Sequence, residues 1–288
     1  MSLSTKPFFL GIDSDGCAID SMEFKHRHCF APATVAVWGL EPVAEAALEC
    51  ALFVNLYSQS RGKNRFPALL ETLDKLRSHP AVKAAGFAVP EASGLRAWLA
   101  DEANPSVPTL ETARTANPGD DLERTLRWNQ AVNERIAEKA DALAAFPGVA
   151  EALGAAREQA YISVLSSANT AAVEREWEDN GLLQYVEAVA AQETGSKTTH
   201  LQRAAAEGFD NTQRLVVGDA PGDLTAARAT RSLFFPIIPG EETASWERFI
   251  REGLPRWFNG RFNPAYQDSL IVDFEHALPD SPPWLHES

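Results

Sequence analysis

The sequence predicts an α/β fold in which a parallel, Rossmann-like sheet lies between two layers of helices. From Val149 to Phe249, short apolar segments alternate with segments of helical periodicity, the pattern of successive β-α-β units. An apolar run at Phe8–Ile12 adds one strand near the start of the chain. It can join the same sheet only if residues 21–145 form an excursion. The other strands are expected at Tyr161–Leu165, Tyr185–Val189, Arg214–Val217 and Leu233–Ile238.

The excursion has the sequence pattern of helices. In Glu41–Val54 apolar residues recur at helical spacing, and Pro42 stands in the first turn, where proline is tolerated. Helices are also expected at Phe66–Leu76 and Leu122–Ala145. A cluster of proline, asparagine and glycine predicts a loop at 104–119.

These assignments predict two domains. Residues 1–20 and 146–288 form a discontinuous α/β catalytic core, and residues 21–145 form a helical domain inserted into it. The core ends in a proline-rich extension that begins near residue 254. Two roles fit this extension, wrapping the core or joining a dimer contact, so the chain is expected to be a monomer or a homodimer.

The first candidate motif follows the strand at Phe8–Ile12. Asp13 and Asp15 come directly after the buried run, and Gly16 follows them. Carboxylates at the end of a buried strand are costly unless they are hydrogen-bonded, paired or bound to a metal. Open α/β sheets also bind their ligands at this end of the strands. The motif therefore indicates a site, although acids that merely cap the next helix would give the same pattern.

A second pair of acids follows the strand expected at Arg214–Val217. Asp219 stands at the tip of this strand, and Asp223 lies near the start of the next helix. Asp223 alone could be an acid favoured by the helix dipole. Together with Asp13, Asp219 would form an all-oxygen site suited to Mg²⁺.

Two further segments could bind an anion. The strand at Tyr161–Leu165 opens into Ser166, Ser167 and Asn169, whose hydroxyls and backbone N–H groups suit phosphate, although a plain helix cap would look the same. Lys197 opens a helix at His200–Glu207, where the dipole disfavours a cation. A surface lysine is the simplest explanation of Lys197, but an acidic phosphate site needs such a counter-cation.

Taken together and in this order, the four segments resemble the motifs of the haloacid dehalogenase-like hydrolase superfamily. Its members carry a DxDG loop, a strand ending in serine or threonine, a lysine that opens a helix and a GDxxxD loop. The resemblance covers roughly residues 7–20 and 146–240, and the helical insertion lies where the superfamily often inserts a cap domain. The chain departs from the usual pattern at Ser14, Cys17 and Thr198. No departure removes a catalytic group.

The resemblance implies a role for each motif residue. Asp13 is the nucleophile, and Asp15 is the general acid and base, which requires a raised pKa if it is to hold a proton at neutral pH. Ser166 and Lys197 hold the phosphoryl oxygens. Mg²⁺ is bound by Asp13, by the backbone carbonyl of Asp15, by Asp219 and by Asp223, the last through water unless it orients Lys197. Gly16, Ser167 and Asn169 are expected to contact the substrate.

Inside the helical insertion, a short cationic segment is a candidate for substrate selection. Arg61, Lys63 and Arg65 lie between two apolar helices. They could reach an anionic part of the substrate, or they could be ordinary solvated loop residues. The nearby run from His26 to Cys29 is not expected to bind metal, because side chains so close together on a helix diverge.

The composition of the chain argues against several classes of partner. The formal net charge of −14 would repel nucleic-acid phosphates, so no nucleic-acid partner is expected. The sequence contains neither an apolar run long enough for a membrane span nor a signal-peptide core, which predicts a cytoplasmic protein with no membrane partner. Its three cysteines show no metal-ligand spacing.

The sequence therefore predicts a magnesium-dependent phosphatase that acts on a small phosphorylated metabolite through an aspartyl-phosphate. The presence of Asp15 argues against dehalogenation, which needs no leaving-group acid. A phosphomutase of the same family would carry the same motifs and would bind a second phosphate near the Arg61–Arg65 segment. A non-catalytic protein that binds phosphometabolites is the third alternative.

Overall fold

The computed structural model describes residues 6–139 and 143–285 of the 288-residue chain. Within this part, the chain divides into two compact units, each described separately below. Among the described residues, the first contains 6–22 and 143–278, and the second contains 23–139 and 279–285. No helix of the described residues is long and apolar enough to cross a membrane.

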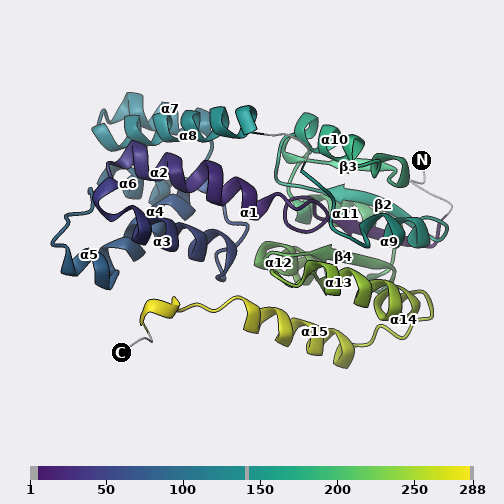
Figure 1. Cartoon of the computed structure of the whole chain (residues 1–288). Helices are drawn as coiled ribbons and strands as arrows, with labels where there is room; N and C mark the ends of the chain where they lie inside the picture. The colour runs from purple at the N-terminus through teal and green to yellow at the C-terminus, as the bar shows by residue number, and fades with distance from the viewer. Residues whose placement is uncertain (1–5, 140–142, 286–288) are drawn as a thin grey trace. The chain divides into compact units, whose positions relative to one another are not determined.

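The first unit is built on a five-stranded sheet whose neighbouring strands are all parallel, which confirms the predicted fold class (Figure 1). The strand order is β3-β2-β1-β4-β5. The strands and helices of this unit are β1 (Phe8–Ile12), α9 (Val149–Ala156), β2 (Ala160–Leu165), α10 (Thr170–Asp179), β3 (Ala188–Ala190), α11 (Lys197–Ala206), β4 (Arg214–Gly218), α12 (Pro221–Thr230), β5 (Leu233–Pro236), α13 (Glu242–Arg248), α14 (Leu254–Phe258) and α15 (Pro264–Ala277).

Helices cover both faces of this sheet. Side chains of α9, α10, α13 and α14 pack with Leu10, Ile12 and Val217 in one apolar cluster. Side chains of α11, α12 and α15 pack with Phe9 and Val216 in another cluster. Adjacent residues of one strand thus enter opposite layers, so the strands are apolar along their whole length, as is usual for buried parallel sheets.

The second unit is helical. Its helices are α1 (Met22–Lys25), which starts at the unit boundary, α2 (Ala31–Trp38), α3 (Ala44–Leu56), α4 (Arg65–Ser78), α5 (Pro80–Ala84), α6 (Ser93–Asp101), α7 (Val107–Ala116) and α8 (Asp120–Lys139). A π-helical turn at His26–Phe30 joins α1 to α2. The apolar faces of α2, α3, α4, α6 and α8 share one core.

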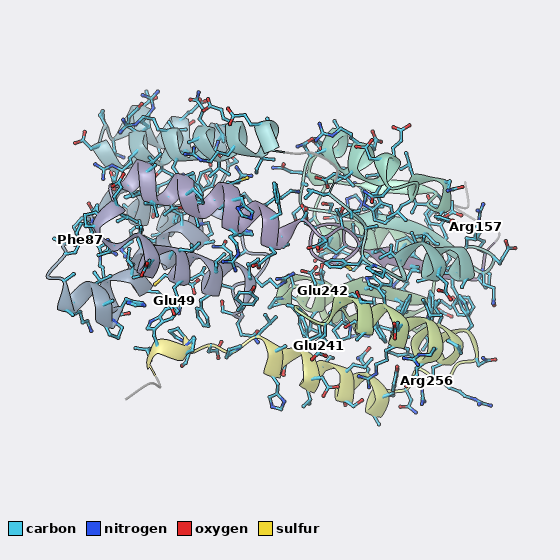
Figure 2. All side chains as sticks on the ribbon, in the orientation of Figure 1. Glu49, Phe87, Arg157, Glu241, Glu242 and Arg256 are labelled. Atoms are coloured by element: carbon cyan, nitrogen blue, oxygen red, sulfur yellow. The ribbon has the colours of Figure 1, made fainter. Side chains whose placement is uncertain are left out.

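The last described residues of the chain pack with this helical unit, whereas the sequence placed them with the core. Trp284 is 7% exposed, and its ring lies 5.5 Å from Phe53 and 5.0 Å from His79. The His79 Nε2 atom is 3.1 Å from a carboxylate oxygen of Glu49, which Figure 2 labels. Burial of a tryptophan explains why a proline-rich tail is held in place.

Three expectations about single elements were wrong. The segment 104–119 contains helix α7, because Ser106 and Thr109 form a capping box and Pro108 occupies the first turn, where proline is tolerated. The third strand is β3, which begins at Ala188, since a 3₁₀ turn occupies Leu183–Tyr185. The helix expected at Leu122–Ala145 ends at Lys139, and part of that range lies outside the described residues.

Candidate active site

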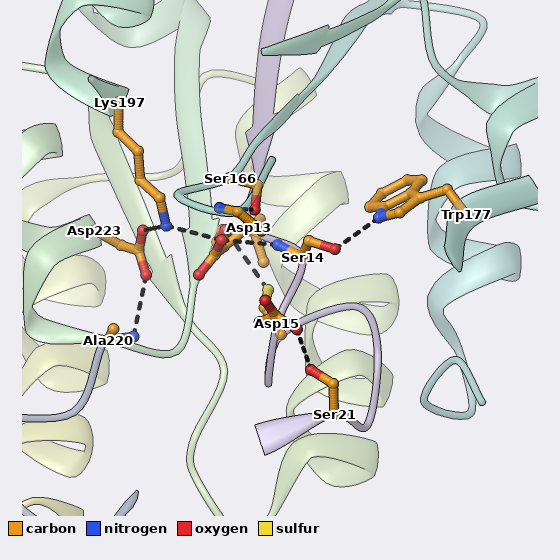
Figure 3. Close-up of polar contacts among 12 residues, drawn as sticks. Asp13, Ser14, Asp15, Ser21, Ser166, Trp177, Lys197, Ala220 and Asp223 are labelled. Atoms are coloured by element: carbon orange, nitrogen blue, oxygen red, sulfur yellow. Dashed lines mark hydrogen bonds and ion pairs between the residues drawn. The ribbon is translucent and has the colours of Figure 1, made fainter. Parts of the chain in front are cut away.

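The predicted site residues of the first unit lie at the carboxyl ends of its central strands. Strand β1 pairs with β2 on one side and with β4 on the other, so the order of the strands reverses at β1. A crevice for ligands forms at such a point in open α/β sheets. Asp13 follows β1, Ser166 follows β2, and Asp219 follows β4. The polar contacts around Asp13 are drawn in Figure 3.

Three buried carboxylates converge at this edge. Asp13, Asp219 and Asp223 each offer an oxygen within 4.8 Å of the others, and their exposed fractions are 7%, 1% and 0%. Asp223 lies in the first turn of α12, where its Oδ2 accepts a hydrogen bond of 3.1 Å from the backbone N–H of Ala220. Gly218 is needed beside it, because a Cβ atom there would lie 2.4 Å from the Asp223 carboxylate.

Lys197 bridges two of these carboxylates. Its Nζ atom is 2.8 Å from Asp13 Oδ1 and 2.5 Å from Asp223 Oδ1 (Figure 3). Burial alone would lower the pKa of Lys197, but the carboxylates of Asp13 and Asp223 outweigh burial, and the net shift is upward. These two contacts explain why a cation occupies the first turn of α11 against the helix dipole.

Asp13 is held in a strongly acidic environment. Its Oδ1 accepts a hydrogen bond of 2.8 Å from the backbone N–H of Ser14. Burial raises the pKa of Asp13 well above its ordinary value; Lys197 opposes the rise, and Asp223 and Asp219 add to it. Buried charge is costly unless it is balanced.

The donor set fits a divalent metal ion. Three carboxylates against one lysine would carry two surplus negative charges when all three are ionised. A divalent cation would balance them, and hard oxygen donors are the ligands that Mg²⁺ prefers. In the part of the chain that the structure describes, Asp13, Asp219 and Asp223 form the group of residues able to hold a metal.

Asp15 is held by a residue that the sequence analysis did not identify. The fully buried hydroxyl of Ser21 donates a hydrogen bond to Asp15 Oδ1 (Figure 3). Between them the chain turns at Gly16, whose φ of +78° lies in the left-handed region that glycine adopts without strain. The sequence contained no signal for this pairing, because a serine six residues after an aspartate has no recognisable motif.

In the loop after β2, Ser166 lies at the site, whereas the side chain of Asn169 caps the next helix. Ser166 is 4% exposed, and its Oγ accepts a hydrogen bond of 3.1 Å from the backbone N–H of Ala168, which leaves its O–H able to donate. The Oδ1 atom of Asn169 accepts from the N–H of Ala172, so this residue is the N-cap of α10. Ser167 is exposed.

The three cations of the helical unit differ in their surroundings. Arg61 is 4% exposed, and its Nη1 donates a hydrogen bond of 3.1 Å to the carbonyl of Leu56 in helix α3. Lys63 is paired with Glu71, with 3.0 Å between Nζ and Oε2. Both of these cations have contacts within the helical unit that account for them structurally.

Arg65 contacts only neutral groups among the polar and aromatic partners that the structure shows for it. Its Nη1 atom donates to the side-chain oxygens of Asn129 and Asn133 at 2.9 and 2.8 Å. Its guanidinium lies 5.2 Å from the centre of the Phe30 ring. Burial lowers the pKa of Arg65. A partly buried guanidinium without an acidic partner is suited to binding an anion.

The chain also matches a family model for haloacid dehalogenase-like hydrolases over residues 106–234. This match covers less than half of the chain and agrees with the resemblance of the four motifs. The family that the four motifs resemble is therefore also the one whose model this chain matches. A search of curated proteins finds no match.

Two solved structures are similar to this chain. A predicted phosphoglycolate phosphatase from Haemophilus somnus is 14% identical, with a TM-score of 0.50 over 80% of this chain and 85% of that chain. A haloacid dehalogenase-like family hydrolase from Xanthomonas campestris is 11% identical, with a TM-score of 0.47 over 89% of this chain and 96% of that chain. At these identities the likeness concerns the fold alone.

Proposed function

We propose that the chain hydrolyses a phosphoric monoester of a small metabolite, with Asp13 as nucleophile and Mg²⁺ as cofactor. One observation carries the proposal: the carboxylates of Asp13, Asp219 and Asp223 converge in a buried site that holds a single lysine. If the lysine served only in a structural ion pair, one carboxylate would be enough to balance its charge, whereas this site contains three. The surplus of acid is what a metal-dependent phosphoryl site requires.

In the first half of the proposed reaction, a carboxylate oxygen of Asp13 attacks phosphorus. The bond between phosphorus and the leaving oxygen breaks, and its electron pair stays with that oxygen. Asp15 donates a proton to this oxygen, so the leaving group departs as an alcohol. Lys197 and Ser166 donate hydrogen bonds to the phosphoryl oxygens as charge moves onto them.

In the second half, water attacks the phosphorus of the aspartyl-phosphate. Asp15, now ionised, takes the proton from this water, and the bond to Asp13 breaks with its electron pair returning to the carboxylate. When bound by Asp13, Asp219, Asp223 and the carbonyl of Asp15, Mg²⁺ would neutralise negative charge on the transferring group. Asp223 also orients Lys197 through their ion pair.

For substrate selection, we propose Arg65 as the principal cation of the helical unit. Lys63 is engaged by Glu71, and Arg61 is packed against the end of α3, whereas Arg65 faces only amide oxygens and a ring. The substrate would then carry a second anionic group besides the phosphate ester. The same residue could hold the second phosphate of a phosphomutase substrate, so products must be identified as well as phosphate release.

The first test compares two substitutions in the same loop. Asp13→Asn keeps the size of the side chain but removes the attacking charge, and we expect it to abolish magnesium-dependent hydrolysis of p-nitrophenyl phosphate. Asp20→Asn makes the same chemical change at an exposed position and should leave turnover intact. Near wild-type activity of Asp13→Asn, or turnover that is indifferent to magnesium, would refute the proposal.

A further inference from the structure

We infer that two tryptophans, Trp177 and Trp246, are positioning residues that hold the catalytic loop from two sides. The inference rests on the proposed function, since it assigns these residues a role in the reaction of Asp13. Neither tryptophan belongs to the four motifs. Each is fully buried, and each donates a hydrogen bond from its indole N–H to the loop that follows β1.

The first contact reaches the residue between the two catalytic acids. Trp177 of α10 donates from Nε1 to the hydroxyl oxygen of Ser14 over 2.9 Å, and both side chains are 0% exposed (Figure 3). The carbonyl of Ser14 accepts hydrogen bonds from the N–H groups of Ala18 and Ile19 at 3.0 and 2.9 Å. Ser14 therefore connects the turn of the loop to the helix layer, and its neighbour on either side is a catalytic aspartate.

The second contact reaches the far side of the same turn. Trp246 of α13 donates from Nε1 to the backbone carbonyl of Cys17 over 2.9 Å, and its side chain is 0% exposed. Helices α10 and α13 belong to the same layer but to different β-α units, so the loop is fixed at two points by separate elements.

The ring of Trp177 also packs beside the loop that contains Ser14. Ser14 is a small residue, and the indole of Trp177 packs in the same apolar cluster as Cys17, Ala18 and Ile19. The ring supplies volume, and its N–H supplies a fixed bond. The rate of phosphoryl transfer depends on the exact positions of Asp13 and Asp15. Displacement of the loop by a fraction of an ångström would move both carboxylates and lower this rate.

The chain offers a matched control. Trp257 of α14 belongs to the same unit, is 1% exposed, and donates from Nε1 to the backbone carbonyl of Thr212, also over 2.9 Å. Its hydrogen bond has the same donor and length, is partly buried, and does not reach the catalytic loop. Trp177→Phe, Trp246→Phe and Trp257→Phe each keep an aromatic ring and remove one indole N–H.

The experiment measures kinetics and hydrogen exchange on these three full-length variants. We expect Trp177→Phe and Trp246→Phe to lower kcat for p-nitrophenyl phosphate roughly tenfold with KM changed less than about twofold. We also expect faster deuterium uptake in the peptide that covers residues 13–21. Trp257→Phe should lower the melting temperature by a similar amount to the other two variants, but it should change neither kcat nor deuterium uptake in residues 13–21. Unchanged kcat in the first two variants, or loop exchange no faster than in Trp257→Phe, would overturn the inference.

Ser14→Ala provides an independent approach to the first contact, because it removes the acceptor and keeps the ring of Trp177. Ser14→Ala, Trp177→Phe and the double variant should lower kcat by the same factor, since all three break one bond. Additive losses would show that the two side chains act separately and would overturn this contact. The exchange measurement separates the two proposals: if wild-type protein hydrolyses no phosphate ester, the proposed function fails, while loop exchange still reports whether the indoles hold the loop.

Discussion

Substitution of Asp219 by asparagine should have opposite effects on stability and on metal binding. Without a divalent ion, the Asp219 carboxylate lies beside two other carboxylates in a buried site, and the one lysine there pairs with those two. At 4.8 Å and an effective dielectric constant of about 20, one pair of like charges repels by about 3 kcal/mol. The positive charge of Lys197, which pairs with Asp13 and Asp223, and protonation of a neighbouring carboxyl both reduce this repulsion.

We therefore expect metal-free Asp219→Asn to be more stable than the wild type by about 1–3 kcal/mol, which raises the melting temperature by several degrees. Added magnesium should stabilise the wild type strongly and the variant weakly, because binding to the folded state alone adds stability and the variant has lost one ligand. Thermal melts with a chelator and with magnesium give both quantities. Asp268→Asn, at an exposed position of α15, should change neither.

Two outcomes would refute this reasoning. A metal-free Asp219→Asn variant that melts below the wild type would mean that the carboxylates are not in mutual repulsion. Equal stabilisation of variant and wild type by magnesium would mean that Asp219 is not a ligand. Either result would remove the surplus of buried acid as support for a metal site.

The other predictions concern the acid and the cap cation. Asp15→Ala should lose most turnover on alkyl phosphates and less on p-nitrophenyl phosphate, because nitrophenolate departs with little protonation; equal losses would exclude Asp15 as the general acid. Arg65→Ala should raise KM for the preferred anionic metabolite and lower kcat/KM about ten- to hundredfold, with a smaller effect on p-nitrophenyl phosphate. Lys63→Ala is its control and should leave kcat/KM unchanged for both substrates, since this lysine is already paired with Glu71. Equal effects of the two variants would mean that Arg65 has only a structural role.

Much of the core could be predicted because its signals are local. Buried strands followed by acids identify the ends of β1 and β4, and the alternation of strands and helices identifies a parallel sheet. The convergence of Asp13, Asp219 and Asp223 then follows from the geometry of parallel strands, whose carboxyl ends share one edge. The helix α7 was missed because its prolines and asparagines were interpreted as loop residues, although Pro108 is compatible with a first turn.

The supporting contacts of the site could not be predicted, because they join residues far apart in sequence through ordinary side chains. Trp177 reaches Ser14 across 163 positions of the chain, and Trp246 reaches Cys17 across 229. No spacing rule connects such pairs. In the same way, Arg61, Lys63 and Arg65 look alike in the sequence. Only the structure shows that Arg61 donates to a backbone carbonyl, that Lys63 pairs with Glu71, and that Arg65 donates to amide oxygens.

The central claim is that the phosphoryl group of the substrate is transferred to Asp13. Rapid acid quenching tests this claim most directly. Enzyme mixed with p-nitrophenyl phosphate and magnesium would be quenched in acid during turnover, digested and mapped by mass spectrometry. The account predicts a phosphoryl group on the peptide that contains Asp13, at that residue, and its loss on treatment with hydroxylamine. A phosphoryl group on Ser166 instead, or steady turnover with no phosphorylated peptide at any quench time, would contradict it.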